Sequence, residues 1–552
     1  MKTRWYKDAV VYQIYPRSFF DANGDGIGDL PGILEKADYL KTLGVDAVWL
    51  SPCYKSPNDD NGYDISDYRD IMDEFGTMAD FDKMLDAFHS RGIRVLMDLV
   101  VNHTSDEHAW FKESRKSRDN PYRDYYIWRD GTGPDKKRPP NGWRACFGGS
   151  AWEYDETTGQ FYLHLFSKKQ PDLNWDNQKV RQEVADICNF WLQKGVDGFR
   201  CDVITYISKP ADLYHANQRD VVVGPNWKTY MRELSERSLG RYDTLIVGEA
   251  AGIDFPRACE ITKEGEDLLD MLFHFEHVEV GTVCAKNQKS TDLRKWKGIL
   301  ARWQALPETS WGAVYYENHD RPRSLPRFAP AGPLRVPAAK SLAASLLFQK
   351  GTAFLYQGEE LGMTNCVFRR ADYRDIQSRN LLRDVRRYAG PLGAYIAERH
   401  LRRYARDHAR TPMQWDDTAN AGFTTGTPWM KVNENYREIN ARQELDDPDS
   451  VFRFYKDALA VRRRYIDLVR DGTFSLVDAA NREVFAFVRT LGEKRLLVVC
   501  SLSPKPAGCA VPADLCKGKA TLLLQNTEMP AAPRETLRLA PCACAVWYIE
   551  AE

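Results

Sequence analysis

Eight short apolar runs recur along the chain, and amphipathic stretches of helical length separate most of them. The runs occupy residues 10–16, 45–52, 93–101, 196–203, 244–250, 269–275, 312–320 and 352–360. Helical patterns lie near 31–43 and 78–91, and again in 177–195 and 336–351. Near-continuous apolar strands that alternate with helices indicate a parallel sheet covered by helices. Eight such units favour an α/β fold with a closed (β/α)8 TIM barrel over an open sheet.

Two segments depart from this alternation and indicate additional domains. About seventy residues separate the third run from the helix near residue 178, which is too long for a plain loop. We therefore expect an inserted domain at 104–175, after the third strand, between the barrel segments 1–103 and 176–470. From about residue 470, alternating runs with turns between them predict a C-terminal antiparallel β-sandwich domain at 471–552.

The composition excludes several classes of partner. The formal net charge of −1 gives no reason to expect nucleic acid or an anionic membrane as a partner. No run reaches the roughly 20 apolar residues of a membrane helix, and the N-terminus lacks the apolar stretch of a signal peptide. None of the twelve cysteines forms a C-x-x-C pair, which is typical of reduced residues in a cytoplasmic protein. The default expectation is a monomer or weak dimer.

Charged side chains stand at the carboxyl ends of predicted strands, where barrels of this class carry their chemistry. Arg200 and Asp202 lie two residues apart and therefore share one face of the fourth strand. Glu249 follows the fifth strand and Asp320 the seventh, so three carboxylates are expected in one pocket. A single such Asp more often caps a helix, but the coincidence on separate strands favours catalysis.

The surroundings of these carboxylates predict different protonation states. Arg200 beside Asp202 is expected to keep it ionised, as a nucleophile requires. Glu249 has no adjacent cation in the sequence and follows an apolar run, so it is the better general acid. Together they make the arrangement of a retaining glycosidase.

Four motifs resemble, in order, the signature regions of the α-amylase family of glycoside hydrolases (family 13). They are DLVVNH (98–103), GFRCDVI (198–204), VGEA (247–250) and ENHD (317–320). The resemblance implies that Asp202 is the nucleophile, oriented by Arg200, and that Glu249 is the acid/base. It further implies that Asp320 grips sugar hydroxyls and stabilises an oxocarbenium-like transition state.

The same resemblance implies the residues that bind the sugar ring. His103 and His319 would hydrogen-bond the ring, and Tyr63 would stack under it. QPDLNW (170–175) and TPMQW (411–415) resemble motifs of oligo-1,6-glucosidases, dextran glucosidases and trehalose-6-phosphate hydrolases, which release a terminal glucose. By that resemblance Asp60 and Arg410 would clamp the non-reducing glucose and block longer chains there.

The inserted domain is expected to contribute to the same pocket. The resemblance implies that Phe147, Phe166 and Gln170 line it. Val203 directly follows the proposed nucleophile, and in this subfamily a Val there goes with preference for α-1,6 linkages. The alternative is that Val203 merely completes its strand, where β-branched residues are common. We therefore expect a retaining, exo-acting α-glucosidase for a small oligosaccharide such as isomaltose, with no catalytic cofactor.

A loop near the N-terminus has the composition of a cation site. DANGDGIGD (21–29) places Asp21, Asn23, Asp25 and Asp29 at alternating spacing around glycines, which suits Ca²⁺. The alternative is a polar loop with Asx turns. The subfamily often binds Ca²⁺ here, so the resemblance implies a structural Ca²⁺, or Mg²⁺ instead, with the carbonyl of Ile27 as a further ligand.

Rival functions remain open on the same scaffold. A trehalose-6-phosphate hydrolase needs cations to hold a phosphate, and the sequence offers Arg321, Arg323, Arg369 and Arg370. An α-1,4-preferring or transglycosylating α-glucosidase is a second alternative. A sucrose isomerase is disfavoured, because RPRSLPRF (321–328) stands where an RLDRD-like segment is expected. Non-catalytic family members lack the carboxylates and carry a membrane helix.

Overall fold

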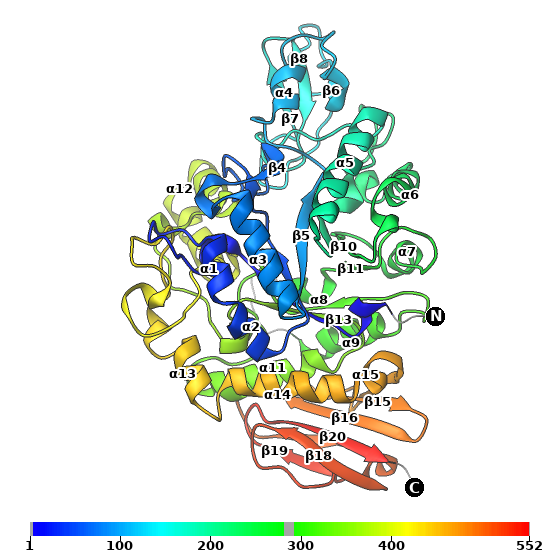
Figure 1. Cartoon of the computed structure of the whole chain (residues 1–552), viewed down its shortest axis with the longest axis vertical. Helices are drawn as coiled ribbons and strands as arrows, with labels where there is room; N and C mark the ends of the chain where they lie inside the picture. Colours follow the sequence, from blue (N-terminus) through cyan, green and yellow to red (C-terminus); the bar gives the residue numbers. More distant parts are fainter. Residues whose placement is uncertain (1–3, 281–291, 551–552) are drawn as a thin grey trace.

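A computed structural model describes residues 4–280 and 292–550. Its parts follow one another along the long axis of the molecule, with a small sheet domain at one end, a barrel in the middle and a β-domain at the other end (Figure 1). No helix in the described ranges combines the length and apolarity that crossing a bilayer requires. Cys284 lies outside the described residues.

Eight parallel strands form the central sheet, and each lies within one of the predicted apolar runs. They are β1 (Val10–Ile14), β2 (Ala47–Leu50), β5 (Arg94–Val100), β9 (Gly198–Asp202), β10 (Leu245–Glu249), β11 (Met271–Phe273), β12 (Ala313–Val314) and β13 (Thr352–Tyr356). Their order is β11-β10-β9-β5-β2-β1-β13-β12, so the eighth strand pairs with the first. The sixth and seventh strands end this order and follow each other in the chain, which is the topology of a (β/α)8 barrel, as predicted.

Helices cover the outside of the strands (Figure 1). They are α1 (Leu30–Glu35), α2 (Ala37–Leu43), α3 (Met78–Ser90), α5 (Gln178–Lys194), α6 (Trp227–Arg237), α7 (Phe255–Ile261), α8 (Glu276–Glu279), α9 (Leu293–Gln304), α10 (Leu325–Phe328), α11 (Arg335–Leu347), α14 (Val451–Arg464) and α15 (Ile466–Asp471). The helix expected near 31–43 is two helices, because Lys36 leaves helical geometry between them (φ −96°, ψ 7°).

The inserted domain rises from the barrel rim after β5. It contains α4 (Ala109–Ser114) and a sheet of β6 (Trp128–Arg129), β8 (Gln160–Leu163) and β7 (Trp152–Asp155), in that order. Its two stems meet at the rim, because His103 and Asp172 form an antiparallel bridge. Nearby, β3 (Tyr54–Lys55) and β4 (Asp67–Ile71) form a hairpin whose loop holds Asp60 and Tyr63.

The C-terminal domain consists of two antiparallel sheets. The larger contains β14 (Thr473–Val477), β15 (Val484–Leu491), β16 (Lys494–Ser501), β20 (Cys544–Glu550) and β18 (Lys519–Gln525), in that order. The smaller pairs β17 (Ala507–Ala510) with β19 (Thr536–Leu539). One apolar cluster joins the two sheets, with Val499 and Trp547 from the first and Cys509 and Leu537 from the second. This is the β-sandwich that the alternating pattern predicts.

A long excursion between β13 and α14 was not foreseen as a separate feature of the barrel segment. It contains α12 (Ile376–Tyr404) and α13 (Ala441–Asp446). Asp375 caps α12 by accepting hydrogen bonds from the backbone N–H groups of Gln377 and Ser378, at 2.9 and 3.2 Å. The helix is kinked at Gly390 (φ 61°, ψ −158°), which precedes Pro391.

Candidate active site

The predicted carboxylates meet at the carboxyl ends of the barrel strands. Asp202 and Glu249 are the last residues of the neighbouring strands β9 and β10. Arg200 lies between them and is fully buried. Its guanidinium contacts Asp202 at 2.6 Å, Glu249 at 2.5 Å and Asp98 at 2.8 Å. Arg200 therefore serves both predicted catalytic groups, whereas the sequence suggested that Glu249 has no cation beside it.

The two carboxyl groups differ in how readily they lose a proton. Burial raises the pKa of Glu249 to about 8 and that of Asp202 to about 7, against the opposing attraction of Arg200. A hydrogen bond from Glu249 lowers the pKa of Asp202. The pair therefore tends to keep one proton near neutral pH, which suits a nucleophile beside a general acid.

Asp98 anchors Arg200 from the third strand, β5. One of its oxygens accepts the bond from Arg200, and the other accepts hydrogen bonds from Tyr63 and from the Trp49 indole, both at 3.1 Å. Asp98 is the first residue of the motif DLVVNH, and its place in the sequence indicates no role for it. Its burial and its three donors make it the group that orients Arg200 and Tyr63.

Asp320 is held by cations from a distant part of the chain. One oxygen of Asp320 contacts Arg406 at 2.9 Å and Arg410 at 2.8 Å, and the other lies 3.3 Å from Nε2 of His319. Burial alone would raise the pKa of Asp320, but the positive charges of Arg406 and Arg410 hold it well below its ordinary value. Asp320 is therefore ionised around neutral pH.

Asp60 and Arg410, which are both expected to clamp the glucose, contact different partners. Asp60 contacts Arg406 at 3.3 Å and the amide of Gln170 at 3.2 Å. Arg410 contacts Asp320 and Asp375. The two arginines lie four residues apart, and only the three-dimensional structure shows that Arg406 is the one that reaches Asp60. Arg406 was not among the site residues that the sequence predicted.

Tyr63 and His319, which are both expected to contact the sugar ring, lie against each other. The ring of His319 stacks on that of Tyr63, with centroids 5.1 Å apart and an interplanar angle of 5°. His319 is fully buried, and burial lowers its pKa to about 3, so it is neutral. His103 contacts the carbonyl oxygen of Tyr63 at 3.0 Å and the amide of Gln170 at 3.2 Å, which ties the inserted domain to Tyr63.

Phe147 and Phe166, the two phenylalanines expected to line the pocket, lie beside His103 and Arg406. Phe147 and Phe166 contact each other with centroids 5.9 Å apart. Phe166 also packs against His103, and the Arg406 guanidinium lies over the Phe147 ring at 5.1 Å. A cleft lined by Phe147, Asp320, Arg406 and one side of α12 leads to these two rings.

Val203 adopts an unusual backbone conformation next to Asp202. Strand β9 ends at Asp202, and Val203 has φ 36° and ψ 35°, in the left-handed region. A β-branched residue is rare there because its side chain crowds the backbone. The idea that Val203 only completes its strand is therefore wrong. Its N–H donates to Glu249 at 3.3 Å, which links this turn to the general acid.

In the loop 21–29, the side chains predicted to bind a metal accept hydrogen bonds from backbone N–H groups of the same loop. Asp21 accepts hydrogen bonds from Gly24 and Gly26, both at 2.7 Å, and Asn23 and Asp25 each accept one from the residue two places on. Asp29 bonds Ala22 N–H at 3.2 Å and also caps α1. These oxygens are hard donors of the type that Ca²⁺ takes. In the described ranges, however, no three His, Cys, Asp or Glu side chains are placed to hold an ion, so the fit is partial.

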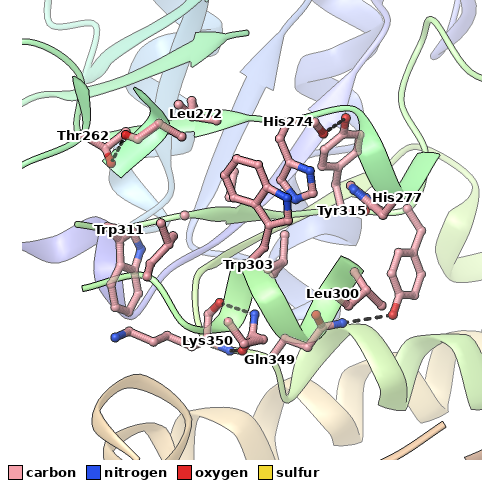
Figure 2. A pocket seen from close by; sticks show the side chains of 17 residues that line it. Thr262, Leu272, His274, His277, Leu300, Trp303, Trp311, Tyr315, Gln349 and Lys350 are labelled. Atoms are coloured by element: carbon pink, nitrogen blue, oxygen red, sulfur yellow. Dashed lines mark hydrogen bonds between the residues drawn. The ribbon is translucent and has the colours of Figure 1, made fainter. Parts of the chain in front are cut away.

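An enclosed cavity elsewhere in the barrel wall lacks the chemistry of the pocket. Figure 2 shows its lining, in which His274 stacks on Trp303 at 3.8 Å and His277 contacts the carbonyl oxygen of Tyr315. No carboxylate lines it, and burial lowers the pKa of both histidines. This pocket lies between the strands and α9, away from the catalytic groups.

The comparisons with known proteins agree with this geometry. Residues 13–472 match the family described as alpha amylase, catalytic domain, and residues 474–546 match the maltogenic amylase C-terminal domain. The chain belongs to the α-amylase family of glycoside hydrolases. As a member, it is an enzyme that hydrolyses glycosidic bonds.

Full-length relatives are similar to this family member over nearly all of its length. It is 50% identical to an oligo-1,6-glucosidase of Halalkalibacterium halodurans, over 95% of each chain. It is 48% identical to an oligo-1,6-glucosidase of Parageobacillus thermoglucosidasius, over 100% of each chain. Among solved structures, a trehalose-6-phosphate hydrolase of Bacillus licheniformis matches with a TM-score of 0.94 and 41% identity, over 99% of this chain and 100% of that one.

Proposed function

We propose that this enzyme is a retaining, exo-acting α-glucosidase that releases terminal glucose from short α-1,6-linked substrates such as isomaltose. One observation carries the proposal. Arg200 holds the buried Asp202 and Glu249 together at the carboxyl ends of β9 and β10, and burial raises the pKa of both carboxyl groups. This pair can supply a nucleophile and an acid at the same pH.

The reaction then has two steps. In the first, Asp202 attacks the anomeric carbon while Glu249 gives its proton to the glycosidic oxygen, so the bond to the leaving sugar breaks and a glucosyl ester forms on Asp202. In the second, Glu249 takes a proton from water, whose oxygen attacks the same carbon and displaces Asp202. Two inversions at one carbon retain the anomeric configuration.

The remaining charges favour the transition state of both steps. Asp320 stays ionised beside the sugar, because Arg406 and Arg410 hold its charge. A fixed negative charge stabilises the positive charge that develops on the ring as the glycosidic bond breaks. The neutral His319 is available as a hydrogen-bond partner for a sugar hydroxyl.

The closed end of the pocket supports exo action. Asp60 is bonded to Arg406 and to Gln170 of the inserted domain, so three segments of the chain meet beyond the glucose site. Another sugar unit on that side would have to break these bonds. The enzyme is therefore expected to accept only the non-reducing end of a chain.

The linkage preference rests on Val203 and on the relatives. The side chain of Val203 is buried beside both catalytic groups, where it limits the approach of the leaving sugar. Two full-length relatives are named oligo-1,6-glucosidase. Both observations favour α-1,6 over α-1,4 bonds.

The rival trehalose-6-phosphate hydrolase is less well supported. Of the four arginines considered for a phosphate, Arg323 is fully buried against Glu317, and Arg321 pairs with Glu279 at 3.1 Å. The other two pair with carboxylates outside the pocket, Arg369 with Asp372 and Arg370 with Glu398. Each of the four thus already has an acidic partner.

Glucose release from five sugars tests the proposal: isomaltose, maltose, sucrose, trehalose and trehalose-6-phosphate. We expect isomaltose to give the highest kcat/KM, and turnover confined to trehalose-6-phosphate would refute the α-1,6 assignment.

Asp202→Asn should abolish turnover with the thermal unfolding temperature preserved, whereas the exposed Asp212→Asn should behave as wild type. Normal turnover by Asp202→Asn would refute the mechanism.

Three sequence-based expectations remain proposals. A cytoplasmic location is supported by the eleven cysteines of the described ranges, all of which are free thiols. A structural Ca²⁺ in the loop 21–29 is supported by the spacing of its oxygen donors. A monomer or weak dimer stays an expectation that sedimentation would test.

A further inference from the structure

One face of α12 lines the cleft that opens beside Asp320. The cleft residues from the first half of this helix include Gln377, Leu381 and Asp384. They are four and three residues apart, so they form one stripe along the helix surface. The stripe faces the inserted domain, because Asn380 of the same helix donates to the carbonyl oxygen of Phe147 at 3.0 Å.

The cleft is narrow at Asp384. A Cβ built on Gly148 of the inserted domain would lie 3.4 Å from a carboxylate oxygen of Asp384. Gly148 has φ 96°, a conformation that disfavours other residues. The backbone conformation thus favours glycine here, and a side chain at this position would touch Asp384 across the gap between the inserted domain and α12.

The stripe continues into solvent at Tyr388. This residue follows Asp384 by four positions, which is about one turn or 6 Å further along the helix. The helix is still regular there, since its non-helical residue is Gly390. Tyr388 is 82% exposed, the highest value among the exposed large apolar side chains of the described ranges. Tyr388 therefore continues the line of cleft residues along the helix and is not part of the hydrophobic core.

We propose that Tyr388 is the platform of an outer substrate-binding site, which holds glucose units of isomalto-oligosaccharides beyond the unit that leaves with the scissile bond. The inference rests on the proposed function. A flat ring offers an apolar surface to the C–H face of a pyranose, and Gln377 and Asp384 offer hydrogen bonds to its hydroxyls. The Arg387 guanidinium, 5.8 Å from the ring centroid, covers one face of Tyr388 and leaves the other for a sugar.

The stripe of residues that ends at Tyr388 is continuous with the cleft beside Asp320, and this continuity indicates that its ligand is the sugar substrate. The other exposed apolar residues of α12, Leu392, Tyr395 and Ile396, lie beyond the kink at Gly390. The stripe from Gln377 to Tyr388, by contrast, alternates polar and apolar groups and begins beside Asp320. That mixture suits a carbohydrate better than a protein surface.

The test compares Tyr388→Ala with wild type on isomaltose and on isomaltopentaose. We expect the kcat/KM for isomaltose to change less than about twofold and that for isomaltopentaose to fall about fivefold through KM, as loss of one aromatic contact predicts. Tyr388→Phe should retain the wild-type preference. Tyr395→Ala is the matched control, since Tyr395 is 55% exposed beyond the kink.

Two outcomes would overturn the inference. One is an equal effect of Tyr388→Ala on both substrates. The other is no effect on either, together with loss of a wild-type dimer in sedimentation, which would make Tyr388 part of a protein interface. Failure of the proposed function would look different, because the wild type itself would not cleave isomaltose.

Discussion

Asp375 binds Arg406 at 2.7 Å through the same oxygen that contacts Arg410 at 3.0 Å. Its other oxygen caps α12. One buried carboxylate therefore fixes both arginines that hold Asp320, and it joins them to the helix that lines the cleft. Nothing in the sequence around Asp375 indicates this role, although the residue joins the arginines of the site to α12.

Loss of the Asp375 charge should misplace both arginines. We expect Asp375→Asn to lower kcat/KM about 100-fold, because breaking a buried charge pair costs about 3 kcal/mol. The amide can still cap α12, so circular dichroism should stay native. Asp417→Asn is the control, since Asp417 forms an exposed pair with Arg442 at 3.9 Å. If both variants have the activity of wild type, Asp375 does not position the arginines.

The pH dependence of the rate should be bell-shaped. Activity needs Asp202 ionised and Glu249 protonated. It should therefore rise as pH passes the pKa of Asp202, about 7, and fall as pH passes that of Glu249, about 8. The two apparent values belong to the pair, because the groups interact. Measuring kcat/KM from pH 5 to 10 checks this expectation.

Glu249→Gln distinguishes the acidic limb from the alkaline limb of the pH–rate profile. With p-nitrophenyl α-glucoside, whose leaving group needs little protonation, the variant should keep some ester formation and lose the alkaline limb. Glu236→Gln, at an exposed position, should leave the profile unchanged. An alkaline limb that persists in Glu249→Gln would assign it to another group.

The backbone strain at Val203 can be compared with that at Val223. Val203 and Val223 both have positive φ, 36° and 51°. Glycine removes a strain of about 1–3 kcal/mol in this region. Val223→Gly should therefore raise the free energy of unfolding by about 1 kcal/mol. Val203→Gly should be nearly neutral, because it also loses a buried side chain.

The two glycine variants should differ in substrate choice. Val203→Gly should lower the ratio of kcat/KM for isomaltose over maltose, whereas Val223→Gly should leave the ratio unchanged. An unaltered ratio in Val203→Gly would remove Val203 from the determinants of linkage.

Occupation of the loop 21–29 by Ca²⁺ should appear as thermal stabilisation. We expect millimolar Ca²⁺ to raise the unfolding temperature of EDTA-treated protein, because an ion bound only to the native state stabilises it. Asp25→Asn should reduce the rise in unfolding temperature, because it removes the charge of one proposed ligand. The fold itself should tolerate the change, since Asp25 is exposed and its side chain accepts a hydrogen bond from the nearby Ile27 N–H. An unfolding temperature that Ca²⁺ and Mg²⁺ leave unchanged would refute the metal prediction.

Local sequence patterns were sufficient to predict the barrel strands, because a strand that is buried on both faces consists of a continuous run of apolar residues. The seventh strand illustrates the limit of such patterns. The run 312–320 yields only the short β12, which ends at Val314, and the chain turns further on at Asn318, whose side chain accepts a hydrogen bond from Asp320 N–H at 2.9 Å. Asp202 and Glu249 were found because each ends a strand, and Asp320 because it closes the motif that follows the seventh strand.

Pairings between distant segments were beyond the sequence. Asp60 and Arg406 are separated by 346 positions, and nothing local distinguishes Arg406 from Arg410 as the partner. Asp375 offers only the signal of a helix cap, which many acidic residues share. The dual bond of Arg200 to Asp202 and Glu249 likewise depends on the register of β9 and β10.

The meeting of the two stems of the inserted domain has a consequence for how such enzymes change over time. His103 bridges to Asp172, and Leu173 N–H donates to the Asn102 carbonyl oxygen at 2.9 Å. For the barrel, the insertion is a loop whose ends are already joined, so its length adds little entropy cost to folding. A change in the length of this segment should thus leave the register of the strands on either side unchanged.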